Sequence, residues 1–239
     1  MNAGMRTVAL TAFMALVLAA PDAEACGGSG PGGTGVCDLS SGPRRSPRLG
    51  ASIVATDTTI LFGQGRRAES TRLVAFASLA LPISRTLTFE SSLGGVLGGE
   101  LRTPGANNRL GPGLATAFGL SYRAVDGAGA RPLVVLGVTG STTATQTRDA
   151  ARPYEAYDVR VSGLLGKTLF GVFTPYALAR AFGGPALYRW DDGARVTGTD
   201  LYKYQLGAGA GLRLGPVDVF VEGAALGERA LAFGLGIRP

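Results

Sequence analysis

Residues 201–214, Leu-Tyr-Lys-Tyr-Gln-Leu-Gly-Ala-Gly-Ala-Gly-Leu-Arg-Leu, alternate in character with a period of two. One set is apolar and begins with two aromatic residues: Tyr202, Tyr204, Leu206, Ala208, Ala210, Leu212 and Leu214. The other set is mostly polar or lacks a side chain: Leu201, Lys203, Gln205, Gly207, Gly209, Gly211 and Arg213. Because successive side chains of a β-strand point to opposite faces, this pattern predicts a strand with one apolar face. The segment exceeds the roughly 9–11 residues that a tilted strand needs to cross a bilayer.

The same period recurs along the chain after residue 47, and no segment there sustains the spacing of a helix. The pattern predicts ten strands, at about 48–60, 71–82, 86–97, 113–125, 132–143, 157–167, 170–182, 201–214, 217–224 and 230–238. Two of them carry a weaker signal, because 71–82 is apolar on both faces and 170–182 contains Pro175. Eight strands therefore remain possible, and twelve would require strands within the connections.

Short and long connections between these strands alternate along the chain. Short turns are predicted at 82–85, 126–131, 167–168 and 215–216, and long polar loops at 61–70, 98–112, 144–156 and 183–200, with a shorter fifth at 225–229. Transmembrane barrels sort their loops in this way, with tight turns at one end and long loops at the other. A spanning segment without helices must also close on itself, since lipid offers no partner for backbone polar groups.

The last segment alternates almost to the final residue, with Leu231, Phe233, Leu235 and Ile237 separated by small residues. From about residue 48 to 239 the chain resembles the bacterial outer-membrane β-barrel proteins, whose last strand is amphipathic. The resemblance implies an antiparallel up-and-down transmembrane β-barrel in the outer membrane, surrounded by lipid. It also implies that the barrel assembly machinery recognises the C-terminal strand. The chain departs from the pattern by ending in Arg238-Pro239 instead of an aromatic residue.

The N-terminus has the features of a signal peptide over residues 1–25. Arg6 provides positive charge, an uncharged stretch of 13 residues runs from Val8 to Ala20, and Ala23-Glu24-Ala25 resembles a cleavage site. An uncleaved anchor or a lipoprotein modified at Cys26 are the alternatives. Residues 26–47 are rich in Gly, Ser and Pro and are predicted to form a flexible leader. Since Cys26 and Cys37 are the two cysteines of an exported chain, a disulfide between them is expected.

Composition excludes several classes of function. The 239 residues include 38 Gly, about twice the average share, and no His. Without His there is no imidazole base and no common His metal site, so we expect no cofactor, no metal and no enzymatic activity. Known enzymes of similar barrel form, the omptin-type proteases, outer-membrane phospholipase and lipid A palmitoyltransferase and deacylase, use a catalytic His. The net charge of +6 is scattered without a basic run, which argues against a nucleic-acid partner.

Two carboxylate pairs remain as candidates for chemistry. Asp191-Asp192 precedes Gly193, and Asp-Gly is a strong turn signal, so a turn is the favoured interpretation over a calcium or catalytic site. Asp218 and Glu222 lie four residues apart and therefore on one face of a strand. The Gly-x-Gly-x-Gly run at 207–211 lies inside a predicted strand, which excludes the strand-to-helix turn of a dinucleotide site.

Ten polar side chains are predicted to face the lumen: Arg72, Glu90, Arg123, Asp158, Arg160, Lys203, Gln205, Arg213, Asp218 and Glu222. Because side chains nearly fill a barrel of this size, we expect an ion-paired plug. The alternatives are a narrow passage with weak anion preference and a small-ligand pocket. Aromatic residues near the strand ends that face the long loops are predicted to form an interfacial girdle: Tyr122, Tyr154, Tyr157, Trp190, Tyr202 and Tyr204.

The sequence therefore favours a small non-enzymatic outer-membrane barrel with a structural or surface-interaction role and an unidentified surface partner. A narrow solute-conducting barrel is the first alternative. The second is an exported soluble β-barrel or sandwich, in the periplasm or secreted, that carries a small apolar ligand.

Overall fold

The computed structural model describes residues 46–190 and 193–238. Their regular structure is β-strand apart from one 3₁₀ turn, η2 (Gly63–Gly65). The strands are β1 (Arg48–Phe62), β2 (Arg67–Pro82), β3 (Leu87–Thr103), β4 (Ala106–Leu110), β5 (Gly113–Asp126), β6 (Leu133–Gln146), β7 (Pro153–Gly166), β8 (Phe173–Gly183), β9 (Pro185–Arg189), β10 (Arg195–Asp200), β11 (Tyr204–Leu214), β12 (Val217–Gly227) and β13 (Arg229–Ile237). No helix in this part of the chain is long and apolar enough to cross a membrane.

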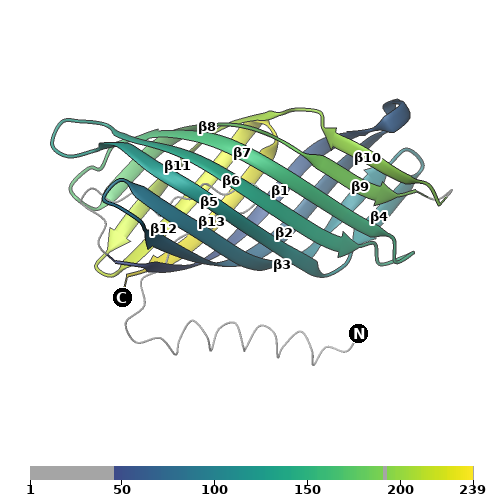
Figure 1. Cartoon of the computed structure of the whole chain (residues 1–239), viewed down its shortest axis with the longest axis horizontal. Coiled ribbons are helices and arrows are strands. Elements are labelled where there is room, and N and C mark those ends of the chain that lie inside the picture. Colours follow the sequence, from purple (N-terminus) through teal and green to yellow (C-terminus); the bar gives the residue numbers. More distant parts are fainter. Residues whose placement is uncertain (1–45, 191–192, 239) are drawn as a thin grey trace, which may run out of the picture.

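The strands close into one antiparallel barrel (Figure 1). Ten strands form its wall within the described residues, as the sequence predicted. Nine of the ten pairings between wall strands join strands that follow one another along the chain. The tenth joins the first wall strand to the last, pairing Leu49–Asp57 of β1 with Ile237–Arg229 of β13. This last pairing removes the free edges, so the backbone hydrogen bonds of every wall strand have partners on both sides.

The remaining three strands lengthen the barrel at one end (Figure 1). β4 pairs with β3, while β9 pairs with β7 and with β10, which in turn pairs with β1. We call the end that carries η2, β4, β9 and β10 the extension end, and the opposite end the turn end. The turn end carries the short connections after β2, β5, β7 and β11 and both ends of the barrel chain (Figure 1).

The prediction of long polar loops was therefore wrong in most places. β1 and β2 leave residues 63–66 between them, 98–112 folds largely into β3 and β4, and 183–200 forms the β9–β10 hairpin. A single residue, Glu228, separates β12 from β13. These segments contain polar residues that face outward, but they alternate with buried Phe62, Leu101 and Tyr188 that face inward. Because burial of these inward apolar side chains stabilises the strands, the strands continue into segments that were predicted to be loops.

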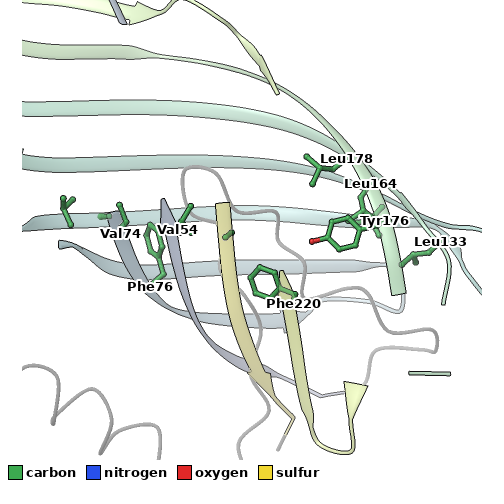
Figure 2. Packing of buried hydrophobic residues seen from close by; sticks show 12 residues of the cluster. Val54, Val74, Phe76, Leu133, Leu164, Tyr176, Leu178 and Phe220 are labelled. Atoms are coloured by element: carbon green, nitrogen blue, oxygen red, sulfur yellow. The ribbon is translucent and has the colours of Figure 1, made fainter. Parts of the chain in front are cut away.

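The interior holds two apolar clusters at different heights. Cluster A lies toward the turn end and contains Val54, Val74, Phe76, Val96, Ala115, Leu133, Val135, Leu164, Tyr176, Leu178, Phe220 and Ala232. Figure 2 shows Phe76, Tyr176 and Phe220 on the inner side of the curved sheet. Cluster B lies in the extension end and contains Ile60, Phe62, Ala68, Leu101, Leu110, Tyr154, Ala186 and Tyr188. Both belong to the face that the period-two pattern turns inward.

Candidate functional site

A layer of charged side chains lies between the two apolar clusters. On β2 the inward residues run from Ala68 of cluster B through Ser70 and Arg72 to Val74 of cluster A. Because inward positions repeat every second residue, the same order on neighbouring strands places their polar residues at similar height. We call this set the charged layer: Arg72, Asp158, Arg160, Arg180, Asp200, Gln205, Glu222 and Glu228.

Two arginines, Arg160 and Arg180, organise the ion pairs of the charged layer. Arg160 donates from both terminal nitrogens to the two oxygens of Glu228, at 2.9 and 3.0 Å, and from Nε to Asp158. Arg180 donates to Glu222 at 2.5 Å and to Gln205. Two parallel bonds between a guanidinium and a carboxylate are among the stronger geometries for a buried pair.

Neutral groups complete this network. Tyr176 donates its hydroxyl hydrogen to Glu222 at 3.2 Å, and the Gln205 amide donates to the backbone carbonyl of Glu228 at 3.2 Å. The network thus joins β7, β8, β11 and β12 to the one-residue turn before β13. Removing one member would leave a buried charge without its partner, which is far costlier than removing both.

Arg72 belongs to the layer but makes a different set of contacts. It is 7% exposed and its guanidinium lies 6.0 Å from the centre of the Tyr154 ring. Within the described residues, Arg72 Nε and the Tyr154 hydroxyl have no hydrogen-bond partner. Both residues, with Asp158 and Asp200, line a cavity of about 20 Å³. A buried water needs about 10–15 Å³, so this cavity has room for one.

The extension end is closed above the charged layer by an aromatic group. The rings of Phe62, Tyr188 and Trp190 lie 5.8–6.3 Å apart, two of the three pairs in edge-to-face orientation. The Arg66 guanidinium covers Trp190 at 5.2 Å from the ring centre. Aromatic pairs at such separations stabilise one another beyond their buried area, so this group stabilises the packing of the extension end.

The turn end holds a second polar group. Ser121 donates to Glu90 at 2.9 Å, and Arg238 donates to Asp218 at 2.7 and 2.9 Å. Arg213 lies 3.6 Å from the same carboxylate. These contacts hold the last residues of the described chain against β11 and β12.

Many inward side chains of the described barrel are buried. They include Arg123 toward the turn end, Phe76 and Arg160 farther along, and Tyr154 and Tyr188 toward the extension end, whereas Asp158, Arg213 and Asp218 are half-buried. A water-filled channel would leave a column of these side chains accessible. Side-chain packing therefore occupies much of the described lumen.

The ten predicted lumen residues are placed as follows. Six are buried: Arg72, Glu90, Arg123, Arg160, Gln205 and Glu222. Asp158, Arg213 and Asp218 are half-buried and take part in ion pairs. Lys203 is the correction, because it is exposed and lies between β10 and β11. The alternation read from the sequence stops at Tyr204, where the chain leaves the strand and the Lys203 carbonyl accepts a hydrogen bond from the Phe182 amide at 2.9 Å.

Three buried charged residues of the interior were missed by the sequence analysis: Arg48, Arg180 and Glu228. Arg180 lies on the strand whose phase Pro175 obscured. Glu228 was predicted to lie in a loop. It is the single residue between β12 and β13, and its buried side chain binds Arg160. The signal that could have found Arg180 is its alternation with apolar Leu178 and Phe182 on the same face.

Of the six predicted girdle aromatics, Tyr122, Tyr157, Tyr202 and Tyr204 are 42–49% exposed. Three were placed wrongly: Tyr154 is fully buried, Trp190 packs against cluster B, and Tyr122 lies at the opposite end of the barrel. The barrel wall continues past Tyr154 and Trp190, so the positions that seemed to be strand ends face the interior. Tyr122 is exposed but lies at the turn end, where it pairs with Leu87 directly after a short turn.

The outer surface carries a broad band of apolar side chains. Many large hydrophobic residues on all sides of the wall are at least 40% exposed, among them Leu93, Leu97, Leu114, Phe118, Leu136, Val159, Val161, Leu165, Leu206, Leu214, Val221, Leu231 and Phe233. Exposed apolar surface on this scale is typical of a protein that contacts a membrane or another apolar partner.

The remaining candidates for chemistry do not assemble into a site. Asp191, Asp192, Cys26 and Cys37 lie outside the described residues, as do the predicted signal peptide and residues 26–45 of the predicted leader. Asp218 and Glu222 share a face as predicted, but the first is bound to Arg238 and the second to Arg180. The described residues contain no group of three potential metal ligands.

Comparison with solved structures relates the chain to other barrels. It is similar to the outer membrane protease OmpT from Escherichia coli at 10% identity and a TM-score of 0.49, over 81% of this chain and 94% of that one. It is also similar to the translocator domain of the autotransporter NalP from Neisseria meningitidis at 13% identity and 0.46, over 82% and 89%. The toluene transporter TodX from Pseudomonas putida has 12% identity and 0.30, over 89% and 94%.

At these identities and TM-scores, the similarities carry no argument about the function of this chain. No protein-family model matches the sequence, and comparison with curated proteins found no similar sequence.

Proposed function

We propose that this chain is a closed, non-conducting and non-enzymatic outer-membrane β-barrel with a structural or surface-interaction role. The observation that carries the proposal is the packed interior, where two apolar clusters enclose a layer of ion pairs. A passage for solutes requires polar side chains that water can reach, whereas here the charged groups bind one another.

The apolar band on the outer wall supports the membrane location. A soluble carrier would bury its apolar residues inside a ligand cavity and leave a polar exterior, whereas this chain also turns apolar residues outward on all sides. The strand alternation with a closing β1–β13 pair is the arrangement that lipid demands of a spanning sheet.

The extension end is the surface we propose for interaction. It presents the β3–β4 and β9–β10 hairpins, and exposed arginines outnumber exposed acidic residues among its described positions. The arginines are Arg67, Arg102, Arg109, Arg148, Arg189 and Arg195. A partner that binds there is expected to be acidic, because Arg side chains bind carboxylates and phosphates in bidentate fashion.

Fractionation and conductance together test the proposal. The protein is expected in the outer-membrane fraction, with an electrophoretic mobility that changes on heating, and without reproducible conductance steps in planar bilayers. Recovery in the soluble periplasmic fraction without detergent would favour the carrier. Reproducible steps would favour the narrow passage, and an anion preference that weakens in Arg72→Gln would locate it in the charged layer.

A further inference from the structure

A groove of about 480 Å³ lies on the outer wall where β13, β1, β2 and β3 meet. Its apolar part is lined by Ala55, Leu73 and Leu231, which are exposed neighbours across three strands. The volume falls within the range of about 300–1,000 Å³ that is usual for small-molecule sites.

The backbone beside this groove is irregular. β2 and β3 change register between Leu73 and Val74, and Gly99 follows on β3 with φ of +155°. A Cβ atom at Gly99 would lie 2.1 Å from the Thr71 carbonyl oxygen, so this position excludes any side chain. The irregular pairing and Gly99 thus lie beside the groove, and the backbone there departs from a regular sheet.

Two opposite charges stand at one end of the groove. Asp57 and Arg229 also line it and lie directly opposite each other in the β1–β13 pairing. Among the described residues neither side chain has a hydrogen bond or an ion pair. Residues directly opposite on one face have Cβ atoms about 4.5–5.5 Å apart, so a ligand bearing two opposite charges can bind both at once.

The position of the groove relative to the apolar band suggests what the ligand is. Asp57 and Arg229 belong to a row of polar residues that crosses the wall through Thr71 and Glu100. On β1 and β13 the exposed side chains on the turn-end side of this row are apolar, including Ile53 and Phe233. The groove therefore extends from the apolar band to its charged boundary, as a lipid extends from acyl chain to headgroup.

We infer that this groove binds one zwitterionic lipid, with an acyl chain against Leu73 and Leu231. Its phosphate receives hydrogen bonds from Arg229, and its ammonium group donates to Asp57. The inference rests on the proposed membrane insertion but is independent of whether the barrel conducts.

Native mass spectrometry tests the inference. The full chain is reconstituted into vesicles of equal parts phosphatidylethanolamine and phosphatidylglycerol with the same acyl chains, then released in mild detergent. We expect one phosphatidylethanolamine retained per barrel, in preference to phosphatidylglycerol. Equal retention of the two lipids, or retention of neither, overturns the inference. Failure of the proposed membrane location is distinct, because the protein would then be recovered without entering the vesicles.

Matched variants locate the lipid. Ala55→Phe fills the groove and is expected to abolish retention, whereas Ala51→Phe, on the same strand and face but outside the groove, is expected to leave it unchanged. Arg229→Gln is expected to weaken retention at least about tenfold, since hydrogen bonds to charged groups are worth about that factor or more. Arg131→Gln at the turn end is its control.

Asp57→Asn provides the charge test. It removes the carboxylate that favours the ammonium group, so the preference is expected to shift from phosphatidylethanolamine to phosphatidylglycerol. Heat-modifiable mobility establishes that each variant folds. If Ala55→Phe does not fold, the charge variants Arg229→Gln and Asp57→Asn still test the inference. Wild-type retention in Ala55→Phe, or an unchanged preference in Asp57→Asn, refutes the assignment.

Discussion

Glu228→Gln is the sharpest test of the charged layer. Glu228 is 1% exposed and binds Arg160 through both oxygens, at 2.9 and 3.0 Å. The amide has nearly the same shape but no charge, and it offers a single acceptor where the carboxylate has two. Arg160, 5% exposed, would then keep Asp158 as its one carboxylate partner in the layer.

The expected cost follows from the burial of the pair. Removing one partner of a buried ion pair costs roughly 3–5 kcal/mol, because the other charge remains out of water. For a barrel of this size, about 1 kcal/mol lowers the unfolding midpoint by about 2–4 °C, which predicts a loss of about 6–20 °C. The assay is the temperature at which the folded electrophoretic form disappears, with urea unfolding in detergent micelles as a second measurement.

Two comparisons make this result interpretable. Glu100→Gln removes an ion pair of similar length, 2.9 Å to Arg102, but on an exposed hairpin where solvent screens the charges, so little change is expected. The double variant Glu228→Gln with Arg160→Met removes both charges and is expected to recover part of the loss. The charged layer does not stabilise the barrel if the unfolding temperature of Glu228→Gln lies within about 1 °C of the wild-type value. The same conclusion follows if the double variant unfolds at no higher temperature than Glu228→Gln alone.

Two further comparisons test other parts of the interior and wall. Tyr154→Phe removes a buried hydroxyl that has no partner among the described residues, so stability should hold or rise; Tyr176→Phe removes a donor to Glu222 and should cost about 1.5–3 kcal/mol, which urea unfolding measures. Equal effects would show that the Tyr154 hydroxyl is hydrogen-bonded. Gly99→Ala should destabilise by at least about 1–3 kcal/mol because of its φ and its contact with a neighbouring carbonyl, whereas Gly140→Ala, with nothing within 4 Å, should be tolerated in the same assay. A harmless Gly99→Ala would mean that this part of the wall adapts.

Particular residues explain how much the sequence could predict. The wall strands were found because lipid or solvent on one face and a packed interior on the other impose a strict period of two. Gln205 and Glu222 were assigned to the interior correctly for that reason. Tyr154 and Trp190 were placed wrongly because they follow polar stretches, and polarity alone does not distinguish a loop from a strand that extends beyond the apolar band.

The partners within the interior could not be predicted at all. Arg160 and Glu228 are 68 residues apart, and Arg180 and Glu222 are 42 apart. Which charges meet across a lumen depends on the register of every intervening strand, and a shift of one residue in any pairing would turn a side chain to the opposite face. The register change between Leu73 and Val74, beside the groove, likewise leaves no mark in the alternation.

The sequence by itself determined that the chain forms an all-β barrel of about ten strands with an apolar exterior, because local alternation and backbone pairing are sufficient for that result. Only the tertiary structure decided that most of the predicted loops are strands, that ion pairs and two apolar clusters lie in the lumen, and that Asp57 and Arg229 line a groove. Those features depend on contacts between residues far apart in the chain, which the closure of β1 on β13 brings together.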